Sequence, residues 1–577
     1  MDMKNLVLSD AYKGFTLDQD KLLTPEETIR RFKEKLAQSD LNILEETVRI
    51  DNGRLDIPVY ISVCGKDARV LTGTKKQMGK GATPAQAEAS AVMELAERFS
   101  FFSYCSNPAN FISSTYRMIR KDAIPFEMIA RSVHDASEEL SISKELFSDL
   151  PLKWANAFNL TSNREVLVPF DWFYTINQFN GPSAGNCVEE ALLQGICEIV
   201  ERHVSSIVSH RRLPVPSIRT ESVKDPVVSG MIEKYRNAGV RLHLSDFTLG
   251  MGIPSVGALA YDPATFPARS EIVWTAGTTP NPLKALSRAL TETAQLAGDF
   301  NTGSNYVASG LPKLKSIGDT ESITNAEKVI DISSLPDLSN ANMRVEVENC
   351  ISALSRKGME IYVIDTMHPR LQIPAFYTII PGAHFRERAL GTSVGMFTAK
   401  LIAESQPPSS ALTRLEDFEN KLPGKYYTQF YIGGCRLKMG RPEEALVHFE
   451  ESLRRSPHPQ DIPSIYSHMG ICLKEMGEYG RAMSALKEGE KLDGDRTDIH
   501  NLMGFCHFKL KQHEQAVECF KKVIALDPSS AIDYANIASN YRDLGKKEDA
   551  IRYYETALSI DPGIEFAREN LDRLKQR

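Results

Sequence analysis

Between residues 426 and 562 the chain repeats itself with a period close to 34 residues. Alanines recur at intervals of 37, 34 and 34 residues: Ala445, Ala482, Ala516 and Ala550. A small residue stands 12 positions before each of them: Gly433, Gly470, Gly504 and Ala538. A period of this length accommodates one pair of helices, and the small residues allow the two helices to pack closely. The pattern predicts an all-α solenoid in which each helix pair packs against its neighbours.

Other positions support the same register. Gly440, Gly477 and Gly545 mark the turn inside three of the repeats, and Lys511 stands at the equivalent place in the other. The pattern resembles four tetratricopeptide (TPR) repeats over 426–562, followed by a polar capping helix over 563–577. Such arrays bind peptides or protein partners; an intramolecular or dimerising role is the alternative.

Two glycine-led segments upstream have a common pattern. Gly81 and Gly185 each stand 13 residues before a glutamate, and both segments end in Glu-x-x-Glu-Arg. Helical spacing puts the polar residues of each segment on one stripe. The first stripe is Gln86, Ser90, Glu94 and Glu97, and the second is Glu190, Gln194, Glu198 and Glu201.

Four carboxylates that are brought together repel one another unless cations lie between them. Mg²⁺ prefers oxygen ligands and usually accompanies phosphate, and a glycine-rich turn that opens a helix suits an anion. A solvated helix face is the ordinary explanation of Glu-x-x-Glu. The small apolar flanks, such as Ala87 and Ala91, and the duplication argue against it. The two segments therefore predict a site for a nucleotide and Mg²⁺.

These residues carry a resemblance to the YcaO family. The matching strings are Gly79-Lys80-Gly81-Ala82-Thr83 with the first Glu-x-x-Glu-Arg, and Ala184-Gly185-Asn186 with Glu189-Glu190-Ala191 and the second. The resemblance implies an α/β domain that binds ATP and Mg²⁺ and phosphorylates the oxygen of a peptide backbone amide. Products in the family are azolines, thioamides or amidines.

The resemblance also implies roles for individual residues. Glu94, Glu97, Glu198 and Glu201 would bind Mg²⁺. Glu201, Arg202 and Arg288 would be catalytic, with the arginines meeting phosphate. Nucleotide contacts would come from Lys21, Thr28, Ser90, Asn186, Glu190 and Glu292. Arg288 and Glu292 share a helix face at i, i+4 spacing, and Gln295 lies near it. His203 follows Arg202, but a single histidine is more often structural, so no general base is assigned.

Composition narrows the class of protein. The formal net charge of −7 gives no electrostatic case for binding nucleic acid or an anionic membrane. The nine cysteines are dispersed without a Cys-x-x-Cys motif, as in proteins of a reducing compartment. We found neither a signal-peptide pattern nor an apolar run of membrane-spanning length, so a cytoplasmic protein without membrane contact is expected.

The predicted architecture is an α/β YcaO-like domain over 1–405, with its core at about 58–400, followed by an all-α TPR solenoid. Strands alternating with helices favour α/β layering in the first domain. Residues 300–345 are expected to be an irregular surface segment, and 406–425, rich in Pro and Ser, a linker.

The main functional hypothesis is an ATP- and Mg²⁺-dependent enzyme that modifies a backbone amide of a peptide or protein. The chain lacks the Pro-rich C-terminus that is common among azoline-forming relatives, which leaves the nucleophile open. Two possibilities stay open: thioamidation with a TfuA-like sulfur-delivery partner, and a supporting role in modifying a cellular protein. Relatives are often dimers, so a homodimer is expected. One alternative is a non-catalytic ATP-binding adaptor that recruits partners through its repeats. The other is a repeat scaffold whose N-terminal domain does not bind nucleotide.

Overall fold

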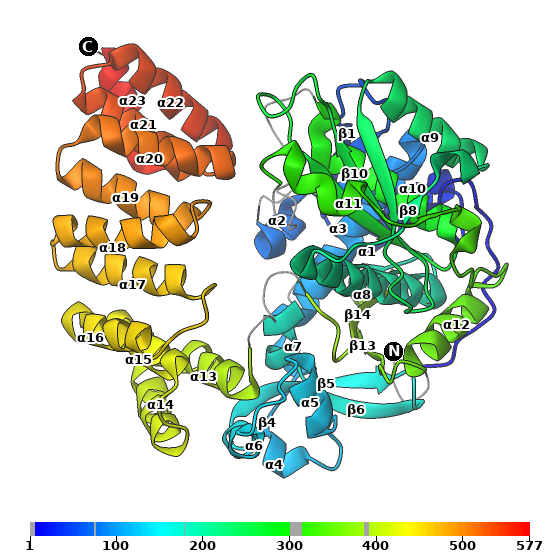
Figure 1. The fold of residues 1–577 in the computed structure, drawn as a ribbon, viewed down its shortest axis with the longest axis horizontal. Helices are drawn as coiled ribbons and strands as arrows, with labels where there is room; N and C mark the ends of the chain where they lie inside the picture. The colour runs from blue at the N-terminus through cyan, green and yellow to red at the C-terminus, as the bar shows by residue number, and fades with distance from the viewer. Residues whose placement is uncertain (1–5, 74–76, 178, 301–313, 386–391, 577) are drawn as a thin grey trace. The chain divides into compact units, whose positions relative to one another are not determined.

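Two structural units follow one another along most of the chain. The computed structural model describes residues 6–73, 77–177, 179–300, 314–385 and 392–576. By residue contacts, the first unit comprises Met1–Ala136 and Pro151–Thr392, and the second comprises Ser137–Leu150 and Ser393–Arg577. The first contains sheets and helices, and the second contains helices alone among its described residues (Figure 1). The prediction of an α/β domain followed by an all-α solenoid is confirmed.

An antiparallel sheet in the order β1-β2-β3 lies near the start of the first unit. Its strands are β1 (Leu44–Arg49), β2 (Val59–Cys64) and β3 (Gln77–Lys80). Helix α3 (Pro84–Ser106) packs on β2 and β3, and α1 (Pro25–Ser39) packs on α3; α2 (Lys66–Thr72) lies beside them. The buried Ala87 and Ala91 let the sheet approach α3 closely, so Ser62 Oγ donates a hydrogen bond to Ala91 O at 2.6 Å.

A second sheet has the order β11-β10-β9-β8-β12. Its strands are β8 (Ser217–Ile218), β9 (Arg241–Asp246), β10 (Ser255–Tyr261), β11 (Val273–Thr278) and β12 (Val329–Ile330). Helix α10 (Pro282–Ala297) covers β10 and β11, and α9 (Pro226–Asn237) packs on α10 and β9. All six residues of β11 are buried, because both of its faces are covered.

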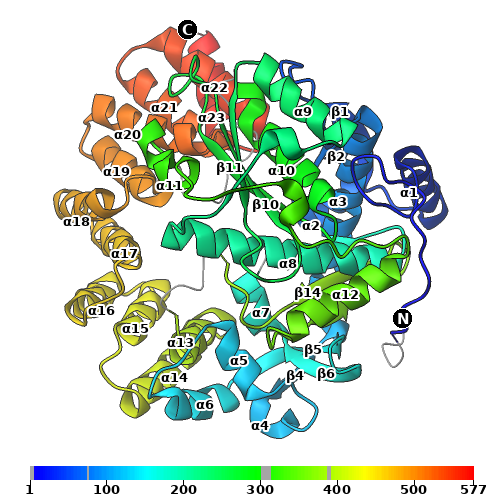
Figure 2. The ribbon, with the colours of Figure 1, turned by 45° about the vertical axis from the view of Figure 1, so that its right-hand side comes forward.

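The third sheet has the order β4-β5-β13-β14-β7, with β6 paired to β5. Its strands are β4 (Ile112–Thr115), β5 (Pro151–Asn159), β6 (Arg164–Pro169), β7 (Pro182–Ala184), β13 (Tyr362–Asp365) and β14 (Ala375–Ile379). Helix α8 (Val188–Arg211) packs on β7 and β14 and also on β11 of the second sheet. Figure 2 shows α8 running between these two sheets. The helix is therefore buried on most sides, which explains its long apolar run.

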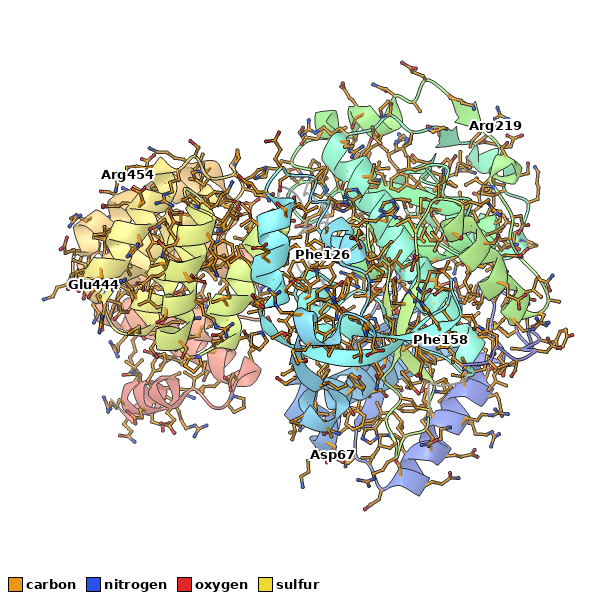
Figure 3. The ribbon with its side chains drawn as sticks, turned by 90° about the horizontal axis from the view of Figure 1, so that it is seen from below. Asp67, Phe126, Phe158, Arg219, Glu444 and Arg454 are labelled. Atoms are coloured by element: carbon orange, nitrogen blue, oxygen red, sulfur yellow. The ribbon has the colours of Figure 1, made fainter. Side chains whose placement is uncertain are left out.

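Further helices complete the first unit. They are α4 (Tyr116–Ile119), α5 (Phe126–Ser132), α7 (Phe170–Asn177), α11 (Glu321–Thr324) and α12 (Met343–Ser355). Helix α12 packs on α8, and α7 packs on β5. Phe126 and Phe158 are buried, whereas Asp67 and Arg219 lie at the periphery (Figure 3). Of the segment 300–345 that was expected to be irregular, residues 301–313 lie outside the described chain, and the remainder includes α11, β12 and the start of α12.

The second unit begins with three helices before the repeats: α6 (Leu140–Ser148), α13 (Val394–Ser405) and α14 (Pro408–Lys421). Helix α13 packs on α6 and α14 and on the first helix of the array. The contact boundary therefore falls before α13, whereas the sequence placed the domain end at residue 405. Most of the stretch 406–425, which composition marked as a linker, is helical, because Ala411, Leu415 and Phe418 form a buried stripe at helical spacing.

Four helix pairs follow. They are α15 (Tyr426–Lys438) with α16 (Pro442–Arg454), α17 (Ile462–Glu475) with α18 (Tyr479–Leu492), α19 (Thr497–Lys509) with α20 (His513–Leu526), and α21 (Ala531–Asp543) with α22 (Lys547–Ile560). Helix α23 (Glu565–Gln576) packs on α22, at the place where the capping helix was expected. Long charged side chains such as Glu444 and Arg454 extend from α16 (Figure 3).

The repeated glycines have the packing role that the sequence suggested. A Cβ on Gly470 would come within 2.5 Å of Leu486, and one on Gly504 within 2.8 Å of Phe520. The turn residues need a left-handed backbone: φ is 72° at Gly440, 77° at Gly477 and 74° at Gly545. Lys511 adopts φ 58° at the equivalent turn, although it has a Cβ.

Among the described residues, none of the helices has the length and apolar character that a membrane span requires.

Candidate functional site

Three helices of the first unit begin in the same way and point the same positions at one cavity. Helices α3, α8 and α10 follow strands β3, β7 and β11 after short turns. Their N-cap side chains, from Thr83, Cys187 and Asn281, each accept a hydrogen bond from the first turn of their helix. Counted from the first helical residue, position +10 is glutamate in all three helices: Glu94, Glu198 and Glu292.

The common register extends to other positions. Position +6 supplies Ser90, Gln194 and Arg288, and position +13 supplies Glu97, Glu201 and Gln295. The sequence revealed this correspondence for α3 and α8, whereas α10, with a different charge pattern, joins it only when the helix starts are known.

Glycines hold the strands against these helices. A Cβ on Gly79 of β3 would lie 2.1 Å from Ala91 N, and one on Gly277 of β11 would lie 2.2 Å from Ala285 O. Gly185 is also close-packed, because its Cβ would lie 2.5 Å from Ala191 N. Backbone stands in the way in each case, so only glycine fits without displacing a helix from the cavity wall.

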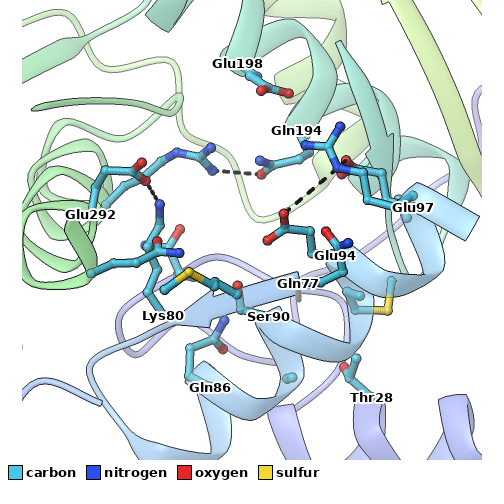
Figure 4. Close-up of a pocket in the computed structure, with 18 of the residues that line it drawn as sticks. Thr28, Gln77, Lys80, Gln86, Ser90, Glu94, Glu97, Gln194, Glu198 and Glu292 are labelled. Atoms are coloured by element: carbon cyan, nitrogen blue, oxygen red, sulfur yellow. Dashed lines mark hydrogen bonds and ion pairs between the residues drawn. The ribbon is translucent and has the colours of Figure 1, made fainter. Parts of the chain in front are cut away.

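The cavity between the three helices has a volume of about 720 Å³. It is lined by every candidate residue except Glu201: Lys21, Thr28, Ser90, Glu94, Glu97, Asn186, Glu190, Glu198, Arg202, Arg288 and Glu292. Figure 4 shows carboxylates converging from different helices, with Glu292 and Glu198 facing Glu94 and Glu97 across the space. Candidate residues that are up to 271 positions apart in sequence, from Lys21 to Glu292, therefore share one polar pocket.

Glu201 lies behind the wall rather than on it. Its side chain is 2 % exposed, and its Oε2 accepts hydrogen bonds from Arg288 Nε at 3.1 Å and from Thr278 N at 3.2 Å. The resemblance implied that Glu201 binds Mg²⁺. In the structure, β11 and α10 pack against this part of α8, and the carboxylate contacts Arg288 and the β11 backbone.

The two arginines differ in how they are held. Arg288 Nη1 also donates to Gln194 Oε1 at 3.1 Å, so two contacts from α8 fix its guanidinium. Burial alone would lower the pKa of Arg288, but Glu201 and Glu198 outweigh burial and raise it. Arg202 lies 3.7 Å from Glu198 and 3.9 Å from Glu201, and its buried Nε has no hydrogen-bond partner in the described chain. A buried donor without a partner on a cavity wall fits an anionic ligand.

The pKa values of two cavity carboxylates are raised, which favours their uncharged forms. Burial raises the pKa of Glu94, against a lowering effect of Arg98. Burial raises the pKa of Glu97 well above its ordinary value, and the charges of Glu198 and Glu94 add to this effect, while Arg98 opposes it. The described residues contain no group of three such side chains that is already arranged as a metal site. Hard oxygen donors at the far ends of long side chains nevertheless fit Mg²⁺, which takes few protein ligands beside phosphate and water.

The N-terminal segment contributes the remaining candidates. Lys21 Nζ lies 3.6 Å from Glu190 Oε1, and Leu22 N donates to Glu190 Oε2 at 2.9 Å. Asn186 Nδ2 donates to Glu190 Oε1 at 3.1 Å. Glu190 therefore ties the segment before α1 to the start of α8. Thr28, near the start of α1, also lines the cavity.

Sequence reasoning missed Lys80, whose ammonium forms an ion pair with Glu292 inside the cavity (Figure 4). Burial lowers the pKa of Lys80 to about 7, and the charge of Arg288 adds to this effect. Its place between Gly79 and Gly81 was the available signal. Arg98, Gln77 and Gln86 also line the cavity without having been assigned. His203 has a structural contact, because its Nδ1 accepts a hydrogen bond from His384 N at 3.0 Å.

Comparison with known proteins shows which family this chain matches. Residues 78–384 match the family described as YcaO cyclodehydratase, ATP- and Mg²⁺-binding, and residues 497–530 and 534–564 match tetratricopeptide repeats. An uncharacterized protein of Methanothermobacter thermautotrophicus is 28% identical over 62% of this chain and 93% of its own length. A second uncharacterized protein, from the tfuA 3′ region of Rhizobium leguminosarum bv. trifolii, is 26% identical over 40% of this chain and 61% of its own length.

A solved structure is similar in fold. The structure of YcaO from Methanopyrus kandleri bound with AMPPCP and Mg²⁺ superposes with a TM-score of 0.51 at 22% identity. The superposition covers 65% of this chain and 95% of that one. The family match spans residues 78–384, which include β3, α3, α8 and α10, so the chain belongs to the YcaO family and carries tetratricopeptide repeats at its C-terminal end.

Proposed function

We propose that this chain uses ATP and Mg²⁺ to phosphorylate the oxygen of a backbone amide in a peptide or protein, and so prepares that amide for conversion to a thioamide, an azoline or a related group. One observation carries the proposal: α3, α8 and α10 each bring a glutamate at position +10 to a cavity that also holds Arg202 and Arg288. Carboxylates opposite arginines suit a metal-bound triphosphate better than an uncharged ligand.

The residues divide by chemistry. Glu94, Glu97 and Glu198 would hold Mg²⁺, which when bound would neutralise charge on the phosphates. Glu201 keeps its place beside Arg288 and acts as a positioning residue. Nucleotide contacts are assigned to Lys21, Thr28, Ser90, Asn186, Glu190 and Glu292, all of which line the cavity.

Arg202 and Arg288 provide positive charge where phosphoryl transfer develops negative charge. Arg288 is already oriented by Glu201 and Gln194, so little reorganisation is needed at the moment of reaction. A nucleophile adds to the amide carbon, and the amide oxygen then takes the γ-phosphoryl group from ATP, which releases ADP. The C–O bond breaks next, so that phosphate leaves with that oxygen. Side-chain donors that are fixed before the reaction make such a site effective.

The incoming nucleophile decides the product. The relative encoded in the tfuA 3′ region favours external sulfide, delivered by a TfuA-like partner. A cysteine or serine side chain of the substrate would give an azoline instead. Mass spectrometry of the modified peptide distinguishes these products, because sulfur replaces oxygen in a thioamide whereas cyclisation removes water.

Calorimetric titration with the non-hydrolysable analogue AMPPCP tests the nucleotide site. Wild-type protein is expected to bind it only with Mg²⁺, and Glu94→Gln/Glu198→Gln is expected to lose that binding. Glu88→Gln is the matched control, because Glu88 lies on α3 but does not line the cavity. Absence of Mg²⁺-dependent binding by the wild type would overturn the proposal. Binding without peptide-stimulated hydrolysis of ATP would favour an ATP-binding adaptor.

A further inference from the structure

One end of the cavity is aromatic, and neither the nucleotide nor Mg²⁺ has been assigned to it. Phe102 of α3, Tyr174 of α7 and Phe179 line this end, together with the charged residues described above. We call these three residues the aromatic subsite. Phe179 is 41 % exposed, so this part of the wall presents apolar surface to water. Apolar surface inside a binding cavity is a place where an apolar group of a ligand can be buried.

The order of side chains along α3 shows where the aromatic subsite lies relative to the reacting groups. Ser90, Glu94, Glu97 and Phe102 follow one another along this helix, and all of them line the cavity. Ser90 is assigned to the nucleotide and the two glutamates to Mg²⁺. From the rise of a helix, Phe102 lies about 7.5 Å beyond Glu97 along the axis, on the side away from Ser90. The subsite therefore begins where the place for metal and phosphate ends.

Two hydrogen bonds hold the segment that carries Phe179 between the carboxylate helices. Arg98 Nη1 of α3 donates to Phe179 O at 3.4 Å, and Gly181 N donates to Glu198 Oε2 of α8 at 3.4 Å. Gly181 adopts φ 97°, and a Cβ there would lie 2.3 Å from Thr378 O, so the turn after Phe179 requires glycine. Phe179 is thereby placed next to the carboxylates that are assigned to Mg²⁺.

Buried rings support Tyr174 from the side of the core. The Tyr174 ring stacks on Phe101, with 6.1 Å between ring centres, and on Phe170, with 5.6 Å. Phe101 and Phe170 are both buried. A ring that is already held in this way loses little conformational freedom when a ligand packs on it.

We propose that the aromatic subsite selects the substrate by binding an aromatic or branched apolar side chain of the peptide, about two residues from the amide that is phosphorylated. That amide has to approach the γ-phosphate, beside the metal carboxylates and Arg202. An extended peptide advances about 3.3 Å per residue, so two residues nearly span the distance from Glu97 to Phe102. This inference rests on the proposed amide chemistry and specifies the class of substrate.

Adenine is the other ligand group that could stack on aromatic rings. The nucleotide contacts are assigned to Ser90 in the first half of α3, and to Asn186 and Glu190 at the start of α8. These positions put the nucleotide toward the starts of both helices, whereas Phe102 stands near the end of α3. The order along the helices therefore favours the peptide.

Competition binding with the full chain, AMPPCP and Mg²⁺ tests the inference by fluorescence anisotropy. The probe is the peptide Gly-Gly-Phe-Gly-Gly-Gly with fluorescein at its N-terminus. Unlabelled competitors carry Phe, Leu, Ala, Asp or Lys at the third position. The Phe and Leu peptides are expected to displace the probe at concentrations at least about tenfold lower than the others, because only they bury a large apolar side chain on the subsite.

The variant Phe102→Ala/Phe179→Ala is expected to weaken binding of the probe about tenfold and to remove the preference for Phe and Leu, with AMPPCP binding retained in calorimetry. Phe179→Ala alone changes an exposed side chain and should lose part of the preference. Phe566→Ala is the matched control, because Phe566 of α23 is 38 % exposed but does not line the cavity. The control should bind probe and nucleotide as the wild type does.

Absence of probe binding, equal displacement by all the peptides, or equal loss in Phe102→Ala/Phe179→Ala and in the control would overturn the inference and leave the nucleotide site in place. Loss of AMPPCP binding by Phe179→Ala as well as by the double variant would assign the rings to adenine, and would also overturn it. A wild type that does not bind AMPPCP with Mg²⁺ would overturn the proposed function and this inference together.

Discussion

Glu201 of α8 and Arg288 of α10 form a buried ion pair, with 3.1 Å between Glu201 Oε2 and Arg288 Nε. The pair joins two helices that both pack on β11, and it fixes the guanidinium on the cavity wall. Glu201 is 2 % exposed and Arg288 15 %, so each needs the other to compensate for lost hydration.

We predict that Glu201→Ala destabilises the first unit by about 3–5 kcal/mol, because it leaves the buried Arg288 without its partner. Glu201→Ala/Arg288→Met should be less destabilised than the single variant. Urea unfolding of wild type, both single variants and the double variant measures this coupling. Additive losses would show that the two side chains do not depend on each other.

Replacing Glu97 by glutamine should stabilise the ligand-free protein. Burial and the neighbouring charges raise the pKa of Glu97, so the folded state favours its protonated form. A raised carboxyl pKa costs stability once pH rises above the unfolded value of 4.5, and the cost is complete above the folded pKa. Glutamine resembles the protonated form and avoids this cost.

The measurement is thermal unfolding at pH 7, with and without Mg²⁺ and AMPPCP. Glu97→Gln should melt about 2–4 °C higher than wild type without ligand and gain less from the ligand. Glu88→Gln, elsewhere on α3, should change neither value. A lower melting temperature for Glu97→Gln would contradict the prediction.

The pair Lys80–Glu292 should give the ligand-free protein a distinct pH dependence. Burial lowers the pKa of Lys80 to about 7 from 10.5, so between these values the unfolded chain binds more protons than the folded chain. The free energy of unfolding should therefore rise with pH across this window, by up to about 1.4 kcal/mol per unit from this group. Below pH 7 the full cost of burying the ammonium applies.

Lys80→Met/Glu292→Gln removes both charges and should remove this rise. Urea unfolding at pH 7, 8 and 9 would follow the difference in stability between wild type and the double variant. The wild type should gain on the variant as pH increases. A difference that does not change with pH would exclude Lys80 as the source.

Lys511→Gly should stabilise the repeat array by about 0.5–1 kcal/mol. Lys511 adopts φ 58°, whereas the equivalent turns of the other repeats use glycine. A left-handed conformation strains a residue with a Cβ, and glycine relieves that strain, although it also adds freedom to the unfolded chain. Scanning calorimetry compares Lys511→Gly with Lys511→Ala, which keeps the Cβ and should gain nothing. Equal melting of the two variants would exclude backbone strain as the cause.

Local sequence pattern was sufficient to predict the secondary structure of the repeats. The 34-residue period located the helix pairs, because each pair packs only on its neighbours and its sequence therefore encodes most of its contacts. The departure of Lys511 from glycine was visible in the same alignment of repeats. Composition marked 406–425 as a linker but did not predict α14 within it, where proline and serine stand at the N-terminus of the helix.

Periodicity alone could not predict which side chains line the cavity. Helical spacing put Glu198 and Glu201 on one stripe, but it could not say which would face the cavity. That choice depends on β11 and α10, which follow α8 in sequence by more than 60 residues. Lys80 was not predicted as a site residue for a similar reason, because its ion-pair partner Glu292 is 212 residues away in sequence.

The sequence by itself determined the order of the two units, the repeats, and the two duplicated carboxylate helices, because these follow from residue spacing within one helix or one helix pair. Only the tertiary structure decided that α10 shares the register of α3 and α8, that Glu201 serves Arg288, and that Lys80 and Glu292 meet. Each of these is a contact between distant segments, and such contacts depend on how strands and helices pack rather than on any local preference.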